Sequence, residues 1–116
     1  MSYYEDIYLR VKNNKELPVT ILENIAKAIE DLGIEDFEQE SHNIRDWWGH
    51  CEWYTSHSDM LELSKQFPDA LFELKGQGED FGDIWGTYYK NGKYHDFIQI
   101  IYSDFDKNLL TDIELN

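Results

Sequence analysis

The hydrophobic periodicity of the chain changes twice between the repeat of a strand and the repeat of a helix, and this order limits the folds open to it. Residues 4–12 alternate between apolar and polar side chains, which predicts a strand with one buried face. Residues 18–32 place apolar side chains on one helical stripe, from Pro18 in the first turn to a stop at Gly33. A second helix is predicted over residues 57–67, with Pro68 ending it.

Large aromatic side chains mark residues 47–55 as a central strand, because such residues favour β structure. Alternation divides the segment into two faces. The more apolar face, expected to point into the core, carries Trp47, Gly49, Cys51 and Trp53, and the other carries Trp48, His50, Glu52 and Tyr54. The acidic residues 34–42 before it predict an edge strand.

The rest of the chain predicts a strand at residues 71–74 and then a hairpin. Residues 84–89 and 94–102 flank Asn91-Gly92, the preferred pair for a tight type I′ turn. Residues 1–116 are therefore expected to form a single α+β domain. Its predicted fold is a ferredoxin-like βαββαβ antiparallel sheet with two helices on one face and an added C-terminal β-hairpin.

Turn and strand motifs between residues 47 and 94 resemble a known family. They are the Trp-rich strand, the Phe-Pro-Asp turn at 67–69, the strand after it, the Gly/Glu loop at 78–80 and the Asn-Gly-Lys turn at 91–93. Together they resemble the ferredoxin-like domain of YubB-type proteins, which are mostly uncharacterised and carried by phages and plasmids. The resemblance implies a fold and a mobile genetic element as the source, and it supplies no catalytic residues.

The net charge of −14, from 24 Asp and Glu against 10 Lys and Arg, restricts the partners of the chain. Such a charge repels phosphate backbones and anionic lipids, so direct binding to nucleic acid or to a membrane is not expected. Cys51 is the only cysteine, which excludes an intramolecular disulfide and fits a reducing compartment. With no apolar run suited to a signal peptide, we expect a cytoplasmic protein.

No combination of residues indicates catalysis, a metal or a cofactor. Among His42, His50, His57 and His95, only His50 has a potential co-ligand fixed by spacing, Glu52 two residues on, and no third ligand follows. His50 and Cys51 are neighbours on a strand and point to opposite faces, so they cannot form a nucleophile–base pair. Glycines 76, 78 and 82 are interleaved with acids, which suits a connecting loop rather than a phosphate site. We therefore expect a protein that is not an enzyme.

Acidic residues are concentrated between residues 28 and 64, where Arg45 is the only Lys or Arg. A single-sign surface of this kind can attract a basic partner, or it can be a solvated rim. Tryptophans near it are either interface anchors or core. The expected partner-binding residues are Glu30, Asp31, Glu35, Asp36, Glu38, Glu40, Asp46, Trp47, Trp48, Glu52, Asp59 and Glu62.

The leading hypothesis is an acidic binding protein of a phage or mobile element that blocks a basic, nucleic-acid-handling protein. It would act as a host-defence antagonist, such as an anti-CRISPR-type mimic of nucleic acid, with carboxylates spaced like phosphates. An immunity protein that neutralises a basic toxin is an alternative of the same class. A small metal-dependent or nucleotide-modifying enzyme is an alternative of another class, and a deep pocket lined by His50 and Glu52 would favour it. A structural accessory domain is a further alternative.

Overall fold

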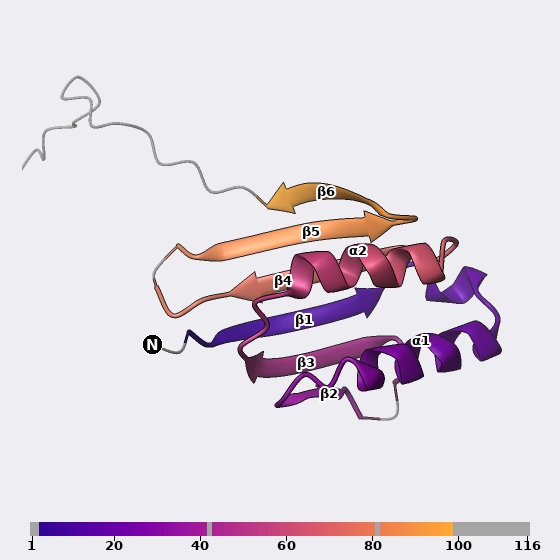
Figure 1. Cartoon of the computed structure of the whole chain (residues 1–116), viewed down its shortest axis with the longest axis horizontal. Helices are drawn as coiled ribbons and strands as arrows, with labels where there is room; N and C mark the ends of the chain where they lie inside the picture. The colour runs from indigo at the N-terminus through magenta and orange to yellow at the C-terminus, as the bar shows by residue number, and fades with distance from the viewer. Residues whose placement is uncertain (1–2, 42, 81, 99–116) are drawn as a thin grey trace, which may run out of the picture.

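The first strand, β1 (Glu5–Val11), lies inside the sheet and has the alternation that its sequence predicts. Ile7, Leu9 and Val11 are buried, whereas Tyr8 and Arg10 between them are exposed. The structure is a computed structural model, and it describes residues 3–41, 43–80 and 82–98 (Figure 1). The further elements, after a short 3-10 helix at Asn14–Glu16, are α1 (Val19–Asp31), β2 (Phe37–Gln39), β3 (Asp46–Cys51), α2 (Ser56–Gln66), β4 (Phe72–Gln77), β5 (Ile84–Lys90) and β6 (Lys93–Ile98).

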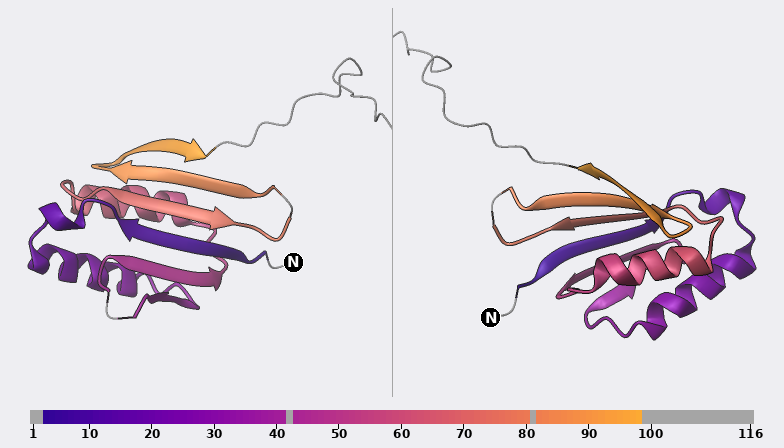
Figure 2. Two further views of the ribbon diagram at one scale, coloured as in Figure 1. Left: turned by 180° about the vertical axis from the view of Figure 1, so that it is seen from behind. Right: turned by 45° about the horizontal axis from the view of Figure 1, so that its top comes forward.

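The strands form one six-stranded sheet in the order β2-β3-β1-β4-β5-β6, and every neighbouring pair is antiparallel. Both helices lie on the same face of this sheet, and no helix of the described residues lies on the opposite face (Figure 2). The chain thus has the α+β class that the periodicity predicts, with two helices and an antiparallel sheet. Neither described helix is long and apolar enough to cross a membrane.

The core lies between the sheet and the two helices. Helix α1 buries Leu22, Ile25 and Ile29, which are spaced as the predicted stripe requires. Strands β1, β3 and β4 contribute the facing layer, and α2 adds Met60 and Leu63. The buried face of the Trp-rich segment is the predicted one, since Trp47, Gly49, Cys51 and Trp53 are all buried.

Three strands have different limits from those predicted. Strand β2 covers three residues rather than 34–42, because Asp36 and Ser41 take positive φ angles (61° and 51°) that no β-strand accommodates. Strand β3 ends at Cys51, so Glu52, Trp53 and Tyr54 belong to the connection to α2. Strand β4 continues to residue 77, past Gly76, whereas the sequence predicts a strand over residues 71–74.

Strands β5 and β6 pair around Asn91 and Gly92, with Lys90 opposite Lys93. Both turn residues have positive φ, 49° and 75°, as a type I′ turn requires. The pairing continues to Gly86 opposite Ile98, with a shift in register between Gly86 and Thr87. The predicted continuation of the last strand, residues 99–102, lies outside the described residues.

Candidate functional site

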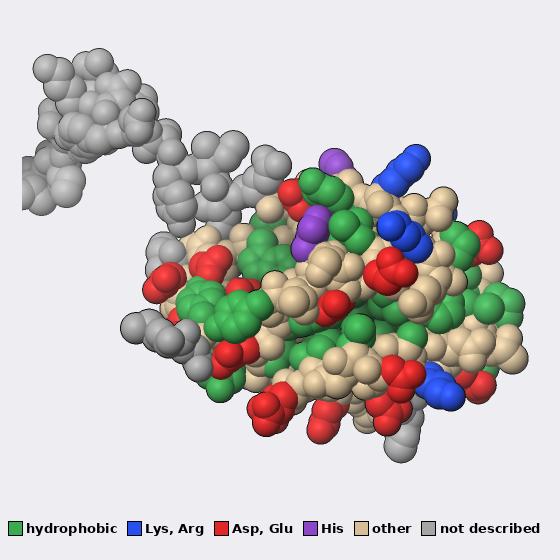
Figure 3. All heavy atoms as spheres, viewed as in Figure 1, with side chains coloured by type: hydrophobic (Ala, Val, Ile, Leu, Met, Phe, Trp, Pro, Cys, Tyr) green, Lys and Arg blue, Asp and Glu red, His purple; other side chains and the backbone are tan. Residues whose placement is uncertain are grey.

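Six exposed carboxylates follow one another along one border of the molecule, where α1 ends and β2 forms the edge of the sheet. We call them the acidic edge: Glu30, Asp31, Glu35, Asp36, Glu38 and Glu40. Figure 3 shows Asp and Glu side chains along the border formed by α1 and β2. Among the described residues, none of the six takes part in a salt bridge. The acidic edge therefore presents a surface of one charge sign to solvent.

A glycine in β3 brings the acidic edge close to the sheet. Gly49 pairs with Phe37, and a Cβ at position 49 would collide with the backbone carbonyl of Asp36. Because glycine has no Cβ, the α1–β2 connection packs directly on β3. The ring of Phe37 then reaches Trp53, with 5.4 Å between the ring centroids. These contacts fix the inner side of β2 by packing and so hold in place the strand that carries Glu38.

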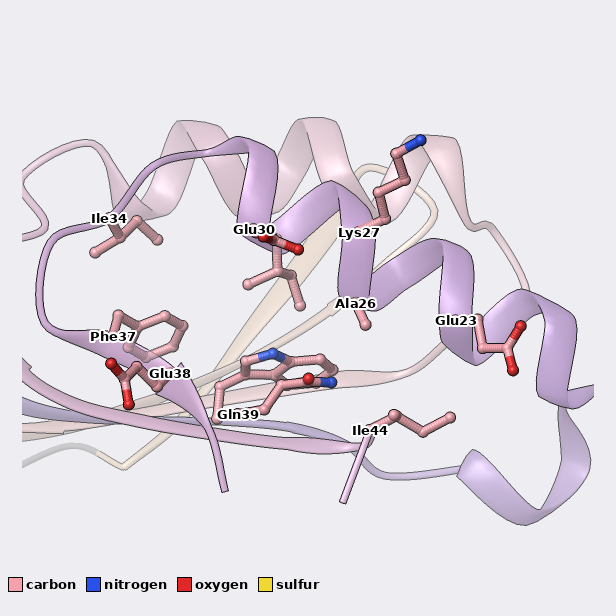
Figure 4. A pocket seen from close by; sticks show the side chains of 11 residues that line it. Glu23, Ala26, Lys27, Glu30, Ile34, Phe37, Glu38, Gln39 and Ile44 are labelled. Carbon is pink, nitrogen blue, oxygen red and sulfur yellow. The ribbon is translucent and has the colours of Figure 1, made fainter. Parts of the chain in front are cut away.

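A groove of about 730 Å³ separates α1 from β2 and the start of β3 (Figure 4). Ile34 and Phe37 lie between the helix and the strand, whereas Lys27 points away from this space. Of the remaining lining residues, the apolar ones form the floor of the groove: Ala26, Ile29, Ile44 and Trp47. The others form a mainly acidic rim: Glu23, Glu30, Glu38 and Gln39. The groove can take an apolar side chain between acidic walls.

On the other side of β2, a hollow of about 480 Å³ opens on the sheet face that the helices leave free. Its lining contains three carboxylates of the acidic edge, one aromatic ring and one imidazole: Asp36, Glu38, Glu40, Trp48 and His50, with Gln39 and Ser41. No Lys or Arg of the described part of the chain lines it. A carboxylate cluster beside an indole ring is suited to a cationic side chain, which is attracted both by the charges and by the ring face.

The two adjacent tryptophans of β3 have opposite environments. Trp48 is 41% exposed and packs against Tyr8 on the free sheet face, with 6.2 Å between ring centroids. Trp47 is only 3% exposed and belongs to the core. The sequence left open whether Trp47 is an interface anchor or part of the core. Its burial corrects the binding expectation to a core role, and only the small part of the ring that lines the groove beside α1 can meet a partner. Trp85 is half-buried and lies on β5, away from β2.

Of the other four acids that the sequence associated with binding, Asp46 adjoins the acidic edge, where its backbone carbonyl accepts from Glu40 N–H at 2.9 Å. Two of the four side chains already have donors. Asp46 accepts hydrogen bonds from Arg10 Nε at 3.0 Å and Asn43 Nδ2 at 2.9 Å. Asp59, in the first turn of α2, accepts from Trp53 Nε1 and Thr55 Oγ1, each at 2.7 Å. Glu52 is half-buried after β3, and Glu62 is exposed on α2. The structure therefore does not bring all ten acids together on one surface.

The histidine and the cysteine of β3 are held by their neighbours. His50 Nδ1 lies 2.8 Å from Asp6 Oδ1, and its ring stacks on Tyr4. Glu52 does not line the hollow that contains His50. Within residues 3–41, 43–80 and 82–98, no three His, Cys, Asp or Glu side chains are placed to hold a metal ion, and His42 is not described. Burial, and then the charge of Asp36, raises the pKa of the Cys51 thiol to about 11, which keeps the thiol protonated and unreactive at neutral pH.

One pocket was missed by sequence reasoning. It lies at the end of the sheet where β1 begins and is lined mainly by aromatic side chains from three separate segments, Tyr3, Trp53, Tyr54, Trp85 and Tyr89, together with Glu5, Ser56, His57 and Thr87. The high aromatic content was the only signal in the sequence. No family model, curated protein or solved structure matches this chain.

Proposed function

We propose that the chain is an acidic, non-enzymatic binding protein that occupies the basic surface of a nucleic-acid-handling protein and blocks its access to DNA or RNA. The observation that supports this most is the hollow beside β2, where Glu38 and Glu40 lie around the exposed ring of Trp48. Lys and Arg side chains of a nucleic-acid groove have the charge and the shape to enter it. Arg also stacks on indole rings, so Trp48 offers a contact that phosphate groups alone do not provide.

The outer edge of β2 offers the partner a second kind of contact. Strand β2 is the last strand on its side of the sheet, so one row of its backbone N–H and C=O groups faces no other described strand. An extended segment of the partner can pair with this edge. Alternate side chains of that segment would then point into the groove beside α1 and into the hollow beside Trp48.

The proposed mechanism is competition. Carboxylates of the acidic edge take the positions of phosphates in the partner's basic groove and exclude nucleic acid from it. Electrostatic attraction of this type mainly accelerates association and selects basic partners, and the apolar groove adds affinity after contact. The resemblance to YubB-type proteins supports a phage or plasmid setting, in which the partner would be a host-defence protein of the CRISPR type.

An immunity protein that neutralises a basic toxin would use the same surface, and the identity of the partner distinguishes the two. We further propose that the fold is ferredoxin-like. The order β2-β3-β1-β4, with antiparallel pairs and both helices on one face, supports this proposal, and β5 with β6 would then be an addition at one side of the sheet.

The proposal is tested with an edge variant that carries Glu35→Lys, Glu38→Lys and Glu40→Lys. All three side chains are exposed, and Asp36 is left unchanged because its positive φ disfavours lysine. The wild-type protein and the variant are used side by side to capture partners from cell extracts. We expect the wild type alone to retain basic, nucleic-acid-binding proteins. The purified partner should lose nucleic-acid binding when wild-type protein is added, and keep it when the edge variant is added.

A control variant with Glu16→Lys, Glu79→Lys and Asp80→Lys changes the net charge equally at exposed positions outside the acidic edge. It should capture and inhibit the partner nearly as well as the wild type does. If the edge variant retains capture and inhibition, the acidic edge is not the binding surface. If both triple variants lose them equally, net charge rather than this site is responsible.

A further inference from the structure

The aromatic pocket at the start of β1 lies apart from the acidic edge and shares no lining residue with it. Its volume is about 290 Å³, at the small end of the range for ligand sites, which suits a head group better than a whole drug-sized molecule. Tyr3 and Glu5 come from the beginning of the chain, Trp53 and Tyr54 from the β3–α2 connection, and Trp85 from β5. In Figure 3, hydrophobic side chains are visible at this end of the molecule with acidic side chains on both sides.

Carboxylates hold the rings of this pocket in place. Trp85 Nε1 donates to Glu5 Oε2 at 2.6 Å, and Trp53 Nε1 donates to Asp59 Oδ2 at 2.7 Å. The phenol of Tyr3 donates to Asp83. The indole of Trp85 also lies over Gly76, where a Cβ would collide with the ring. Rings fixed in this way lose little freedom when a ligand binds, so the pocket is organised in advance.

The charge of the pocket favours a cation. Glu5 lines it, whereas no Lys or Arg among residues 3–41, 43–80 and 82–98 does. A carboxylate that accepts one N–H through one oxygen retains its second oxygen for a ligand. Aromatic ring faces are negative and attract cations. The positive end of α2 also reaches the pocket through Ser56 and His57, but Asp59 in the first turn of the helix offsets it.

We propose that this pocket binds an alkylammonium head group, with the rings of Trp53, Tyr54 and Trp85 around the cation and Glu5 as its counter-charge. Aromatic rings with a carboxylate are the combination that recognises quaternary ammonium groups and methylated lysine side chains. A primary ammonium keeps a tight hydration shell that the apolar rings do not replace. We therefore expect methylated ammonium groups to bind more tightly than unmethylated ones. This site is independent of the acidic edge and of the proposed function.

The decisive comparison is between choline and 3,3-dimethyl-1-butanol, which has the same shape with carbon in place of the charged nitrogen. Each is titrated into the wild-type protein while the four indole N–H signals are followed by NMR. Choline should shift the signals of Trp53 and Trp85 at lower concentration than that of Trp48, whose open hollow also attracts cations, and should leave that of the buried Trp47 unchanged. It should bind about tenfold more tightly than the neutral analogue. A peptide with trimethyllysine, compared with the same peptide carrying unmodified lysine, shows whether a protein side chain is also accepted.

Glu5→Gln tests the counter-charge while keeping an oxygen that can accept from Trp85. This variant should bind choline about tenfold more weakly, whereas Glu16→Gln, at an exposed position that lines neither this pocket nor the hollow beside Trp48, should bind it as the wild type does. Equal binding of choline and its neutral analogue would overturn the proposal, because the pocket would then recognise only shape. The absence of any shift at Trp53 and Trp85 with choline and with the trimethyllysine peptide would overturn it as well.

Discussion

Glu38 and Trp48 lie directly opposite each other across the β2–β3 pair, and both side chains are exposed. The same row continues through Tyr8 on β1 to Lys75 on β4. The acidic edge is therefore continuous with an aromatic strip on the free face of the sheet. A basic side chain that approaches Glu38 can also contact the ring of Trp48, which is why we consider charge and aromatic surface as parts of one site.

The protein should not bind nucleic acid itself. With a net charge of −14, it repels the phosphate backbone, and the exposed ring of Trp48 lies beside carboxylates. We expect no shift of duplex DNA or single-stranded RNA in a gel at physiological salt. A clear shift at low micromolar protein would contradict the view that the protein occupies nucleic-acid sites in place of DNA or RNA.

Removal of a large core side chain should destabilise the protein strongly. Phe72 on β4 is fully buried, and Phe72→Ala should lower the free energy of unfolding by about 3–5 kcal/mol, since it leaves a cavity in the core. Val19→Ala, at an exposed position of α1, should change it by less than about 0.5 kcal/mol. Urea unfolding followed by tryptophan fluorescence measures both. Similar small losses for the two variants would show that the core is packed differently.

Stability should fall in alkaline solution because of Tyr89. Burial raises the pKa of its phenol from 10.0 to about 12, so the folded state keeps a proton that the unfolded state loses. The unfolding free energy should therefore decrease between about pH 10 and pH 12, by about 1.4 kcal/mol per pH unit from this group.

Tyr89→Phe should remove that part of the decrease, and Tyr54→Phe should not, because Tyr54 is 69% exposed. Unfolding in urea at several pH values measures the difference. Cys51 adds a loss of the same sign between about pH 9 and pH 11, which both variants share. An alkaline slope in Tyr89→Phe equal to that of the wild type would mean that the phenol is accessible to water in the folded protein.

Chelation should leave the fold unchanged. His50, the one histidine with a potential co-ligand in the sequence, is engaged with Asp6 and Tyr4 instead. We expect the melting temperature measured with and without EDTA to agree. A decrease of several degrees on chelation would indicate a structural metal.

The helices, the antiparallel sheet and the buried face of residues 47–53 could be predicted because each depends on local periodicity. Alternation alone assigns Trp47 to the core and Trp48 to the free face, once the segment is taken as a strand. The length of β2 could not be predicted. The positive φ angles of Asp36 and Ser41 end the strand. Because aspartate and serine also occur in extended segments, their identity alone does not indicate where the strand ends.

The two proposed sites differ in how much of them the sequence contains. Five of the six carboxylates of the acidic edge lie within residues 30–38, so their proximity follows from a short chain segment. The aromatic pocket depends on the register that brings Glu5 near Trp85, which are 80 residues apart. Periodicity indicates which face a side chain occupies, but it does not indicate which distant residue it will contact.

Whether the acidic edge is the binding surface is tested most directly by the rate at which the captured partner associates with the wild-type protein, the edge variant and the control variant at increasing salt. Raising the salt from about 0.1 M to 1 M shortens the screening length from about 10 Å to 3 Å. We expect the wild type and the control variant to associate rapidly at low salt and more slowly as salt rises, whereas the edge variant should associate slowly at every salt concentration. Equal rates and equal salt dependence for the wild type and the edge variant would contradict it.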